Sequence, residues 1–316
     1  MNIGFLRSML LSIASSLAMG GWFIESMVAS EAYGAPTYYM LMSFFAFMFL
    51  IASEAARRRL IRLPKLRYVA NGILFTTAAM LFIWISNPTN IVALSAIVTL
   101  NMIIFTVINA LHHREGLSMS IVARIFVAAI LVLMALELIA HVGFAGLTQE
   151  DLYLAVAMIF LFGLANYLFS HNSKRAVNEM NFVFWLLLAQ LLVSMSVFVA
   201  LGGGAVHISS GLALYTVSGA ALLFISILTM VYSYRHIKDY GGIMRFVGNN
   251  VLFMLSETDV VFISALYAIF IDAINPDLIL SIVLILASMM AVSTVEEDNG
   301  GKKTNIFTHE QSKTWK

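Results

Sequence analysis

Ten long apolar stretches follow one another along this chain of 316 residues, and they restrict its fold more than any other feature. A helix needs roughly 20 apolar residues to cross a bilayer core about 30 Å thick. Backbone polar groups inside a bilayer must bond within their own segment, so each stretch is predicted to be helical. The predicted segments are Phe5 to Ala29, Pro36 to Ala56, Tyr68 to Ile85, Asn90 to His112, Ser118 to Ala140, Leu152 to Ser170, Asn181 to Leu201, Ile208 to Tyr232, Gly248 to Phe270, and Leu278 to Val295.

Composition supports an all-α integral membrane protein. Hydrophobic residues make up 61% of the chain and charged residues only 11%, whereas soluble domains carry roughly 25% charged residues. The first segment has only Arg7 before it and no convincing small-residue cleavage site, so it is expected to stay as a helix. The absence of cysteine excludes disulfides, thiolate metal sites and a cysteine nucleophile.

Basic residues indicate the orientation of the segments. With ten spans and a cytoplasmic amino terminus, all 18 lysines and arginines fall on the inner side. Both termini are therefore predicted to be cytoplasmic, in the inner membrane of a bacterium or archaeon. The polar tail, 296–316, is expected to be disordered. The outer loops carry no basic residue and lie near Glu31, Asn87, Glu150, Gly203 and Asp272.

The chain also contains a repeat. When Glu115 is aligned with Asp272, the two surrounding segments match as helix, tight acidic turn and helix. Each predicted half, 1–147 and 148–295, holds five spans, an odd number, so the halves are expected to be inverted in the membrane. Inverted repeats are typical of secondary transporters, whose substrate site lies near the midplane.

This architecture resembles the EamA-like branch of the drug/metabolite transporter superfamily. The fourth segment leads through Arg114-Glu115-Gly116-Leu117-Ser118 into the fifth, and Leu17 to Phe23 resembles the first helix of that family. The resemblance implies ten helices as five plus five and a central site formed by the first, third, fourth, sixth, eighth and ninth helices.

The chain departs from that family at two kinds of position. Met102 and Asp259 stand where members often carry a kinking proline. The glycines expected in the fifth and tenth helices are replaced by Ala128, Ala129, Ser281, Ala287 and Ser288, which are small enough for close helix approach.

Three acidic residues inside the predicted spans are candidates for chemistry: Glu25, Glu257 and Asp259. A charge at the bilayer centre costs about 2.5 to 3.5 kcal/mol, so such acids indicate a functional site. Burial favours the neutral carboxyl, so these groups are placed to exchange protons. We predict that Glu257 and Asp259 carry a coupling ion. The alternative roles are purely structural. Glu257 and Asp259 would form hydrogen bonds between helices, and the side chain of Glu25 would extend to the membrane–water interface.

Helical periodicity leaves open which acid of the ninth segment faces the cavity. Glu257 shares a face with Asn250 and Ser264, whereas Asp259 lies about 200° around a continuous helix. When the ninth segment is aligned with the fourth, the polar stripe of the fourth segment falls on the face of the ninth that contains Asp259. This alignment favours Asp259 as the acid that faces the cavity. Both acids are retained as substrate-binding candidates, and the same polar-stripe reasoning adds Trp22, Glu25, Asn101, Asn166 and Tyr215.

Enzymatic readings have little support. The histidines divide between the two sides, and no H-E-x-x-H, G-x-S-x-G or Walker-type motif is present. No metal site, cofactor or nucleic-acid partner is predicted, and a homodimer stays open. The leading hypothesis is a proton-coupled secondary transporter of amino acids, amines or related metabolites. The rivals are a membrane scaffold or regulatory subunit and a flippase for lipids or lipid-linked sugars.

Overall fold

A computed structural model describes residues 3–57, 65–87, 90–113, 119–143, 148–176, 179–203, 206, 208–235, 242–270 and 276–293. Within these ranges the chain is helical and contains no strand, which confirms the all-α prediction. The helices are α1 (Ile3–Tyr33), α2 (Ala35–Arg57), α3 (Leu66–Ile85), α4 (Ile91–Val98), α5 (Asn101–His113), α6 (Met119–Gly143), α7 (Gln149–Arg175), α8 (Glu179–Ala200), α9 (Ser210–Arg235), α10 (Gly242–Ser256), α11 (Asp259–Phe270) and α12 (Pro276–Ser293).

Each of the ten predicted segments overlaps one helix or a pair of helices within the described ranges. Seven helical stretches in the described ranges are long and apolar enough to cross a membrane, the longest being Gly4–Tyr33. These spans make the chain compatible with a multi-pass membrane protein. The turns predicted at Glu115 and Asp272 and the tail 296–316 lie outside the described residues.

Two predicted segments are not continuous helices. The fourth is divided into α4 and α5 by Thr99 and Leu100, and the ninth into α10 and α11 by Glu257 and Thr258. Neither break contains a proline. In each break a threonine hydroxyl donates to the carbonyl three residues earlier, Thr99 at 2.6 Å and Thr258 at 2.8 Å. Such side-chain bonds compete with the helical backbone ladder and often accompany a bend in the helix.

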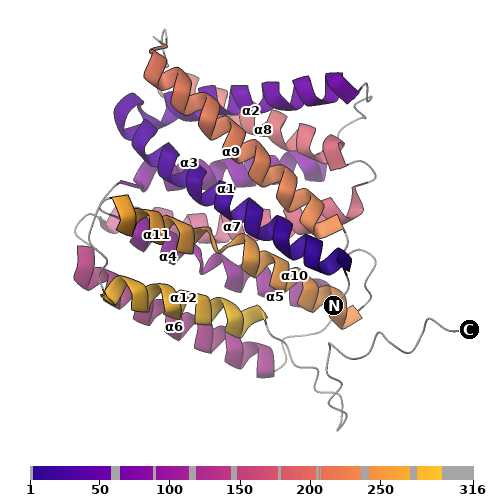
Figure 1. Cartoon of the computed structure of the whole chain (residues 1–316), viewed down its shortest axis with the longest axis vertical. Helices are drawn as coiled ribbons and strands as arrows, with labels where there is room; N and C mark the ends of the chain where they lie inside the picture. Colours follow the sequence, from indigo (N-terminus) through magenta and orange to yellow (C-terminus); the bar gives the residue numbers. More distant parts are fainter. Residues whose placement is uncertain are drawn as a thin grey trace, which may run out of the picture.

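The helices form one bundle in which α2 and α8 lie at one end and α6 packs on α12 at the other (Figure 1). Between these ends, α1 packs along α9, and α3 packs along α7 and α8. The two broken helices lie side by side, with α4 against α11 and α5 against α10. The breaks therefore face each other in the interior, beside α1 and α7.

Four residues predicted for the inner side lie near one another. The rings of His112 and His171 meet edge to face, 5.0 Å apart, and Arg67 and Lys174 lie within electrostatic range of His171. Helix α1 begins and α12 ends at a common side of the molecule (Figure 1). The number of spans and their orientation in the membrane stay predictions.

Candidate functional site

A small, partly open space lies where the two helix breaks meet, and its volume is ≈ 30 Å³. Helices α1, α3, α7 and α9 complete its walls. That volume matches the space of about one water molecule. The polar residues lining it are Ser15, Asn101, Asn166, Ser256, Glu257 and Asp259, and the apolar ones are Met19, Phe23, Phe75, Val98, Phe162 and Met230. We call this space the central cavity.

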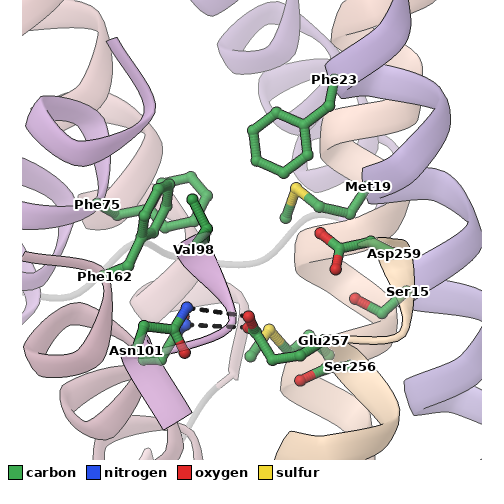
Figure 2. Close-up of a pocket in the computed structure, with 12 residues that line it drawn as sticks. Ser15, Met19, Phe23, Phe75, Val98, Asn101, Phe162, Ser256, Glu257 and Asp259 are labelled. Atoms are coloured by element: carbon green, nitrogen blue, oxygen red, sulfur yellow. Dashed lines mark hydrogen bonds between the residues drawn. The ribbon is translucent and has the colours of Figure 1, made fainter. Parts of the chain in front are cut away.

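Glu257 lies in the second break and reaches across the cavity. Its Oε2 accepts a hydrogen bond from Asn101 Nδ2 at 2.9 Å, and its Oε1 accepts one from Asn166 Nδ2 at 3.1 Å. Figure 2 shows these bonds as dashed lines that join opposite walls of the cavity. The amides are nearly fully buried, with Asn101 1% and Asn166 5% exposed. The two N–H donors hold the carboxyl group of Glu257 in place between α5 and α7.

Asp259 is the first residue of α11 and lines the same cavity as Glu257. Its carboxyl group is close enough to that of Glu257 for direct electrostatic interaction. Figure 2 shows Asp259 pointing toward Met19 while Glu257 points toward Asn101. Periodicity placed the two acids on different helix faces, but the break between α10 and α11 removes that constraint. Both acids therefore face one space.

No basic residue is among those described around the cavity. The apolar part of the wall is aromatic and flexible: the rings of Phe75 and Phe162 meet edge to face at 6.0 Å, and Met19 and Met230 supply thioethers. Two carboxyl groups in such surroundings need protons, a cation or hydrogen bonds to balance their charge.

Glu25 belongs to a separate polar cluster between α1, α2 and α9. The hydroxyl of Ser218 donates to Glu25 Oε1, and Ser26 donates to the hydroxyl of Tyr38 at 3.2 Å. Tyr38 is fully buried, and its hydroxyl fills the space beside Gly219. The carboxyl of Glu25 therefore has partners within the bundle and is absent from the central cavity wall.

Trp22 and Tyr215, the two aromatic candidates, lie away from the cavity wall. Trp22 is fully buried and packs on Phe23 and Tyr39, with ring centroids at 4.7 Å and 6.3 Å. Tyr215 packs on Tyr33 at 6.4 Å. Of the seven predicted binding residues, the structure brings together four: Asn101, Asn166, Glu257 and Asp259.

The apolar wall residues were not predicted. Met19, Phe23, Phe75, Phe162 and Met230 lie in segments where most residues are apolar, so nothing in composition distinguishes a cavity residue from a lipid-facing one. A partial signal exists for Met19 and Phe23. They lie on either side of Gly20 and Gly21, and small residues such as glycine allow close helix approach.

Comparison with known proteins provides a fold and no function. No protein-family model and no curated protein matches the chain. A solved structure described only as "Crystal structure of protein" matches with a TM-score of 0.66 and 16% identity. The match covers 90% of this chain and 96% of that one. At this identity the likeness shows a shared overall fold.

Proposed function

We propose that this chain is a secondary active transporter of small organic metabolites that couples transport to protons by alternating access. The observation that carries the proposal is Glu257: a carboxyl group in a helix break at the centre of the bundle, held by Asn101 of α5 and Asn166 of α7. An ionisable group inside spanning helices is expensive, and it is typically found where substrates or protons move.

The proposal includes two inverted halves, and matched positions support it. Met19 and Phe23 lie four residues apart on α1, and both line the cavity. Phe162 and Asn166 have the same spacing on α7, the helix that the repeat pairs with α1, and also line it. Each pair comes from the first helix of its half, as expected if the cavity lies on the axis that relates the halves.

The two breaks also have wall residues at the same spacing, one position away from the pairing that aligns Glu115 with Asp272. Val98 and Asn101 line the cavity on either side of the first break, three residues apart. Ser256 and Asp259 do so across the second, again three apart. Paired discontinuous helices of this kind form ion and substrate sites in transporters built from inverted repeats.

Glycines beside the breaks follow the same relation. A Cβ on Gly20 would lie 3.2 Å from the carbonyl oxygen of Asp259, the first residue of α11. A Cβ on Gly163 would lie 3.0 Å from the carbonyl oxygen of Asn101, the first residue of α5. The first helix of each half therefore touches the backbone at the start of the second half-helix of the other half. Two contacts of this kind favour a common origin for the halves.

Proton coupling follows from the charge balance. Glu257 and Asp259 share a space with no basic wall residue among those described. Both cannot stay ionised there without a compensating cation, so a change in occupancy must accompany proton uptake or release. A cationic amine can replace the proton, which explains why amino acids and amines are the proposed substrates.

The cavity of ≈ 30 Å³ is too small for any such metabolite. We propose that separation of the halves enlarges this space when substrate binds, as alternating access requires. Phe75 and Phe162 would then contact the apolar part of the substrate. Membership of the EamA-like branch and residence in the inner membrane of a bacterium or archaeon belong to the same proposal.

The first test is the thermal stability of the purified protein with a panel of amino acids, polyamines, nucleosides and cationic drugs at pH 5.5 and pH 8, in sodium-free buffer. A ligand at about 100 times its Kd stabilises the folded state by about 2.7 kcal/mol. The expected result is a pH-dependent response that Glu257→Gln removes. A hit is then followed by uptake into proteoliposomes driven by a pH gradient.

A negative result would be equally informative. No response to the whole panel, with Glu257→Gln and Asp259→Asn both indistinguishable from the parent protein, would overturn the transporter proposal. The membrane-scaffold and lipid-flippase hypotheses would then take its place, and proteoliposomes with fluorescent lipids would separate them.

A further inference from the structure

A second group of polar side chains lies outside the central cavity, where α5 and α7 end and α3 begins. The imidazole rings of His112 on α5 and His171 on α7 meet edge to face, with centroids 5.0 Å apart. The ring of Tyr167, one turn before His171 on α7, contacts both imidazoles, at 5.8 Å and 6.0 Å. These three rings hold the last turn of α5 against the end of α7.

Three basic side chains join the two imidazoles. Lys174 and Arg175 follow His171 by three and four residues, so they lie on the same face of α7. Arg67 comes from the first turn of α3, which is held beside α7 because Asn172 Nδ2 donates to the carbonyl oxygen of Arg67 at 3.2 Å. All three basic side chains lie within electrostatic range of His171. We use the term cationic cluster for these residues: Arg67, His112, His171, Lys174 and Arg175.

Positive charge dominates this cluster. The described groups that act electrostatically on His171 are all basic. The ion pair found among the described residues joins Arg235 to Glu179 and involves neither Arg67 nor Arg175. The ends of α5 and α7 contribute roughly half a negative charge each, and the start of α3 contributes roughly half a positive one. Together the helix ends offset less than one of the two guanidinium charges, so the cluster keeps a net positive charge.

The start of α3 adds hydrogen-bond donors on the same side. Its N-cap residue, Lys65, makes no side-chain cap bond, and the first turn contains no acid. The first N–H groups of a helix favour an anion when no side chain caps them. The Nε of Arg67 is buried and has no hydrogen-bond partner in the part of the chain that the structure describes. Donors and charge together therefore favour an anionic ligand.

Neighbouring apolar side chains indicate which anion fits. Leu66 and Leu111 directly precede Arg67 and His112, and they are 84% and 60% exposed. Such side chains can contact the acyl chains of a lipid whose headgroup lies at the cluster. Basic pockets between membrane-spanning helices bind anionic lipid headgroups. Guanidinium groups match phosphate oxygens because they can form two parallel hydrogen bonds with them.

We propose that the cationic cluster binds the phosphate group of an anionic phospholipid, with Arg67 and Arg175 as its main ligands. Lys174 and the imidazole N–H groups of His112 and His171 supply further donors. A lipid bound there connects the start of α3 to the ends of α5 and α7 and stabilises their packing. The site is separate from the central cavity, so the inference does not depend on transport.

The experiment measures the Tm of the delipidated protein in detergent, at low and constant ionic strength, with phosphatidylglycerol, phosphatidylcholine or inorganic phosphate added. Phosphatidylglycerol is expected to raise the Tm, and phosphatidylcholine to do so by much less. Arg175→Gln, at an exposed position, should weaken phosphatidylglycerol binding about fivefold, the effect of one basic residue near an anionic surface. Arg7→Gln is the matched control, because Arg7 is an exposed basic residue predicted for the same side of the membrane but outside the cluster.

Native mass spectrometry provides a second measurement, because it counts the phosphatidylglycerol molecules bound to each protein. The protein with both Arg67→Gln and Arg175→Gln should lose one bound lipid relative to the parent. If Arg67→Gln does not fold, Lys174→Gln with Arg175→Gln tests the same loss at the end of α7.

Equal effects of phosphatidylglycerol and phosphatidylcholine on the Tm would overturn the inference. So would lipid binding that Arg175→Gln leaves undiminished, or that Arg7→Gln weakens as much as Arg175→Gln does. A Tm increase with inorganic phosphate and none with phosphatidylglycerol would also overturn it, because the cluster would then bind a soluble phosphate compound and not a lipid.

Discussion

The rings of Phe105 and Phe253 stack almost in parallel, with centroids 4.0 Å apart and planes 17° apart. Phe105 follows Asn101 by one helical turn on α5, and Phe253 precedes Glu257 by one turn on α10. One turn farther from the breaks on both helices, the side chain of Asn109 donates a hydrogen bond to that of Asn250 at 3.0 Å. These two contacts close the space between α5 and α10 on the side of the cavity where His112 and His171 lie.

Cross-linking across this closed side should stop transport. The chain contains no cysteine, so a pair introduced as Asn109→Cys and Asn250→Cys reacts without background. A short bifunctional thiol reagent is expected to abolish uptake, because α5 and α10 must separate to open this side, and a cleavable reagent should allow recovery on reduction. Each single-cysteine protein, treated in parallel, should keep its activity. Full transport by the cross-linked protein would show that this contact is not a gate.

The amides that hold Glu257 should couple to it energetically. Hydrogen bonds between helices in membranes contribute about 0.6 kcal/mol on average, with a maximum near 1.7 kcal/mol. The double-mutant cycle of Asn101→Ala and Glu257→Gln is therefore expected to show coupling of about 1 kcal/mol by equilibrium unfolding. Asn109→Ala with Glu257→Gln should be additive within about 0.5 kcal/mol, because Asn109 is bonded to Asn250 and not to the carboxyl group.

The approach of α7 to α5 depends on Gly163. A Cβ there would lie 2.5 Å from the Cβ of Ile104 and 3.0 Å from the carbonyl oxygen of Asn101. Gly163→Ala should destabilise the protein by about 1 to 3 kcal/mol and shift Asn166 away from Glu257. Gly21→Ala is the control, since its Cβ would meet only Leu222 side-chain atoms, at 3.5 Å. Comparable thermal unfolding of both variants would contradict this packing.

Neutralising Glu25 should leave the coupling chemistry intact. Its carboxyl accepts from Ser218 and is absent from the cavity wall, so Glu25→Gln is expected to retain the pH-dependent ligand response that Glu257→Gln loses. The comparison uses the same ligand and the same two pH values for both variants. Loss of the response in the Glu25→Gln protein would place the proton site in the α1–α2–α9 cluster instead.

Hydropathy was sufficient to predict the helices. A bilayer requires each crossing segment to satisfy its own backbone hydrogen bonds, so a stretch such as Tyr68 to Ile85 can adopt little besides helix, and α3 spans Leu66–Ile85. The free-energy cost of a charged side chain inside a bilayer was sufficient to indicate the acids. That cost does not depend on the direction in which the helix points the carboxyl group, so Glu257 and Asp259 could be predicted from sequence without knowledge of their surroundings.

Tertiary structure decided which polar groups meet. Asn166 and Glu257 are 91 residues apart in sequence, and their contact depends on how closely α7 approaches the broken helices at Gly163. Trp22 had the same helical periodicity as a cavity residue yet packs on Tyr39. The break at Glu257 and Thr258 directs both acids toward one cavity. It contains no proline, so the sequence does not predict it. The local sequence pattern indicates which residues of a segment must be buried. The register between helices and the position of the breaks depend instead on packing against side chains from other helices.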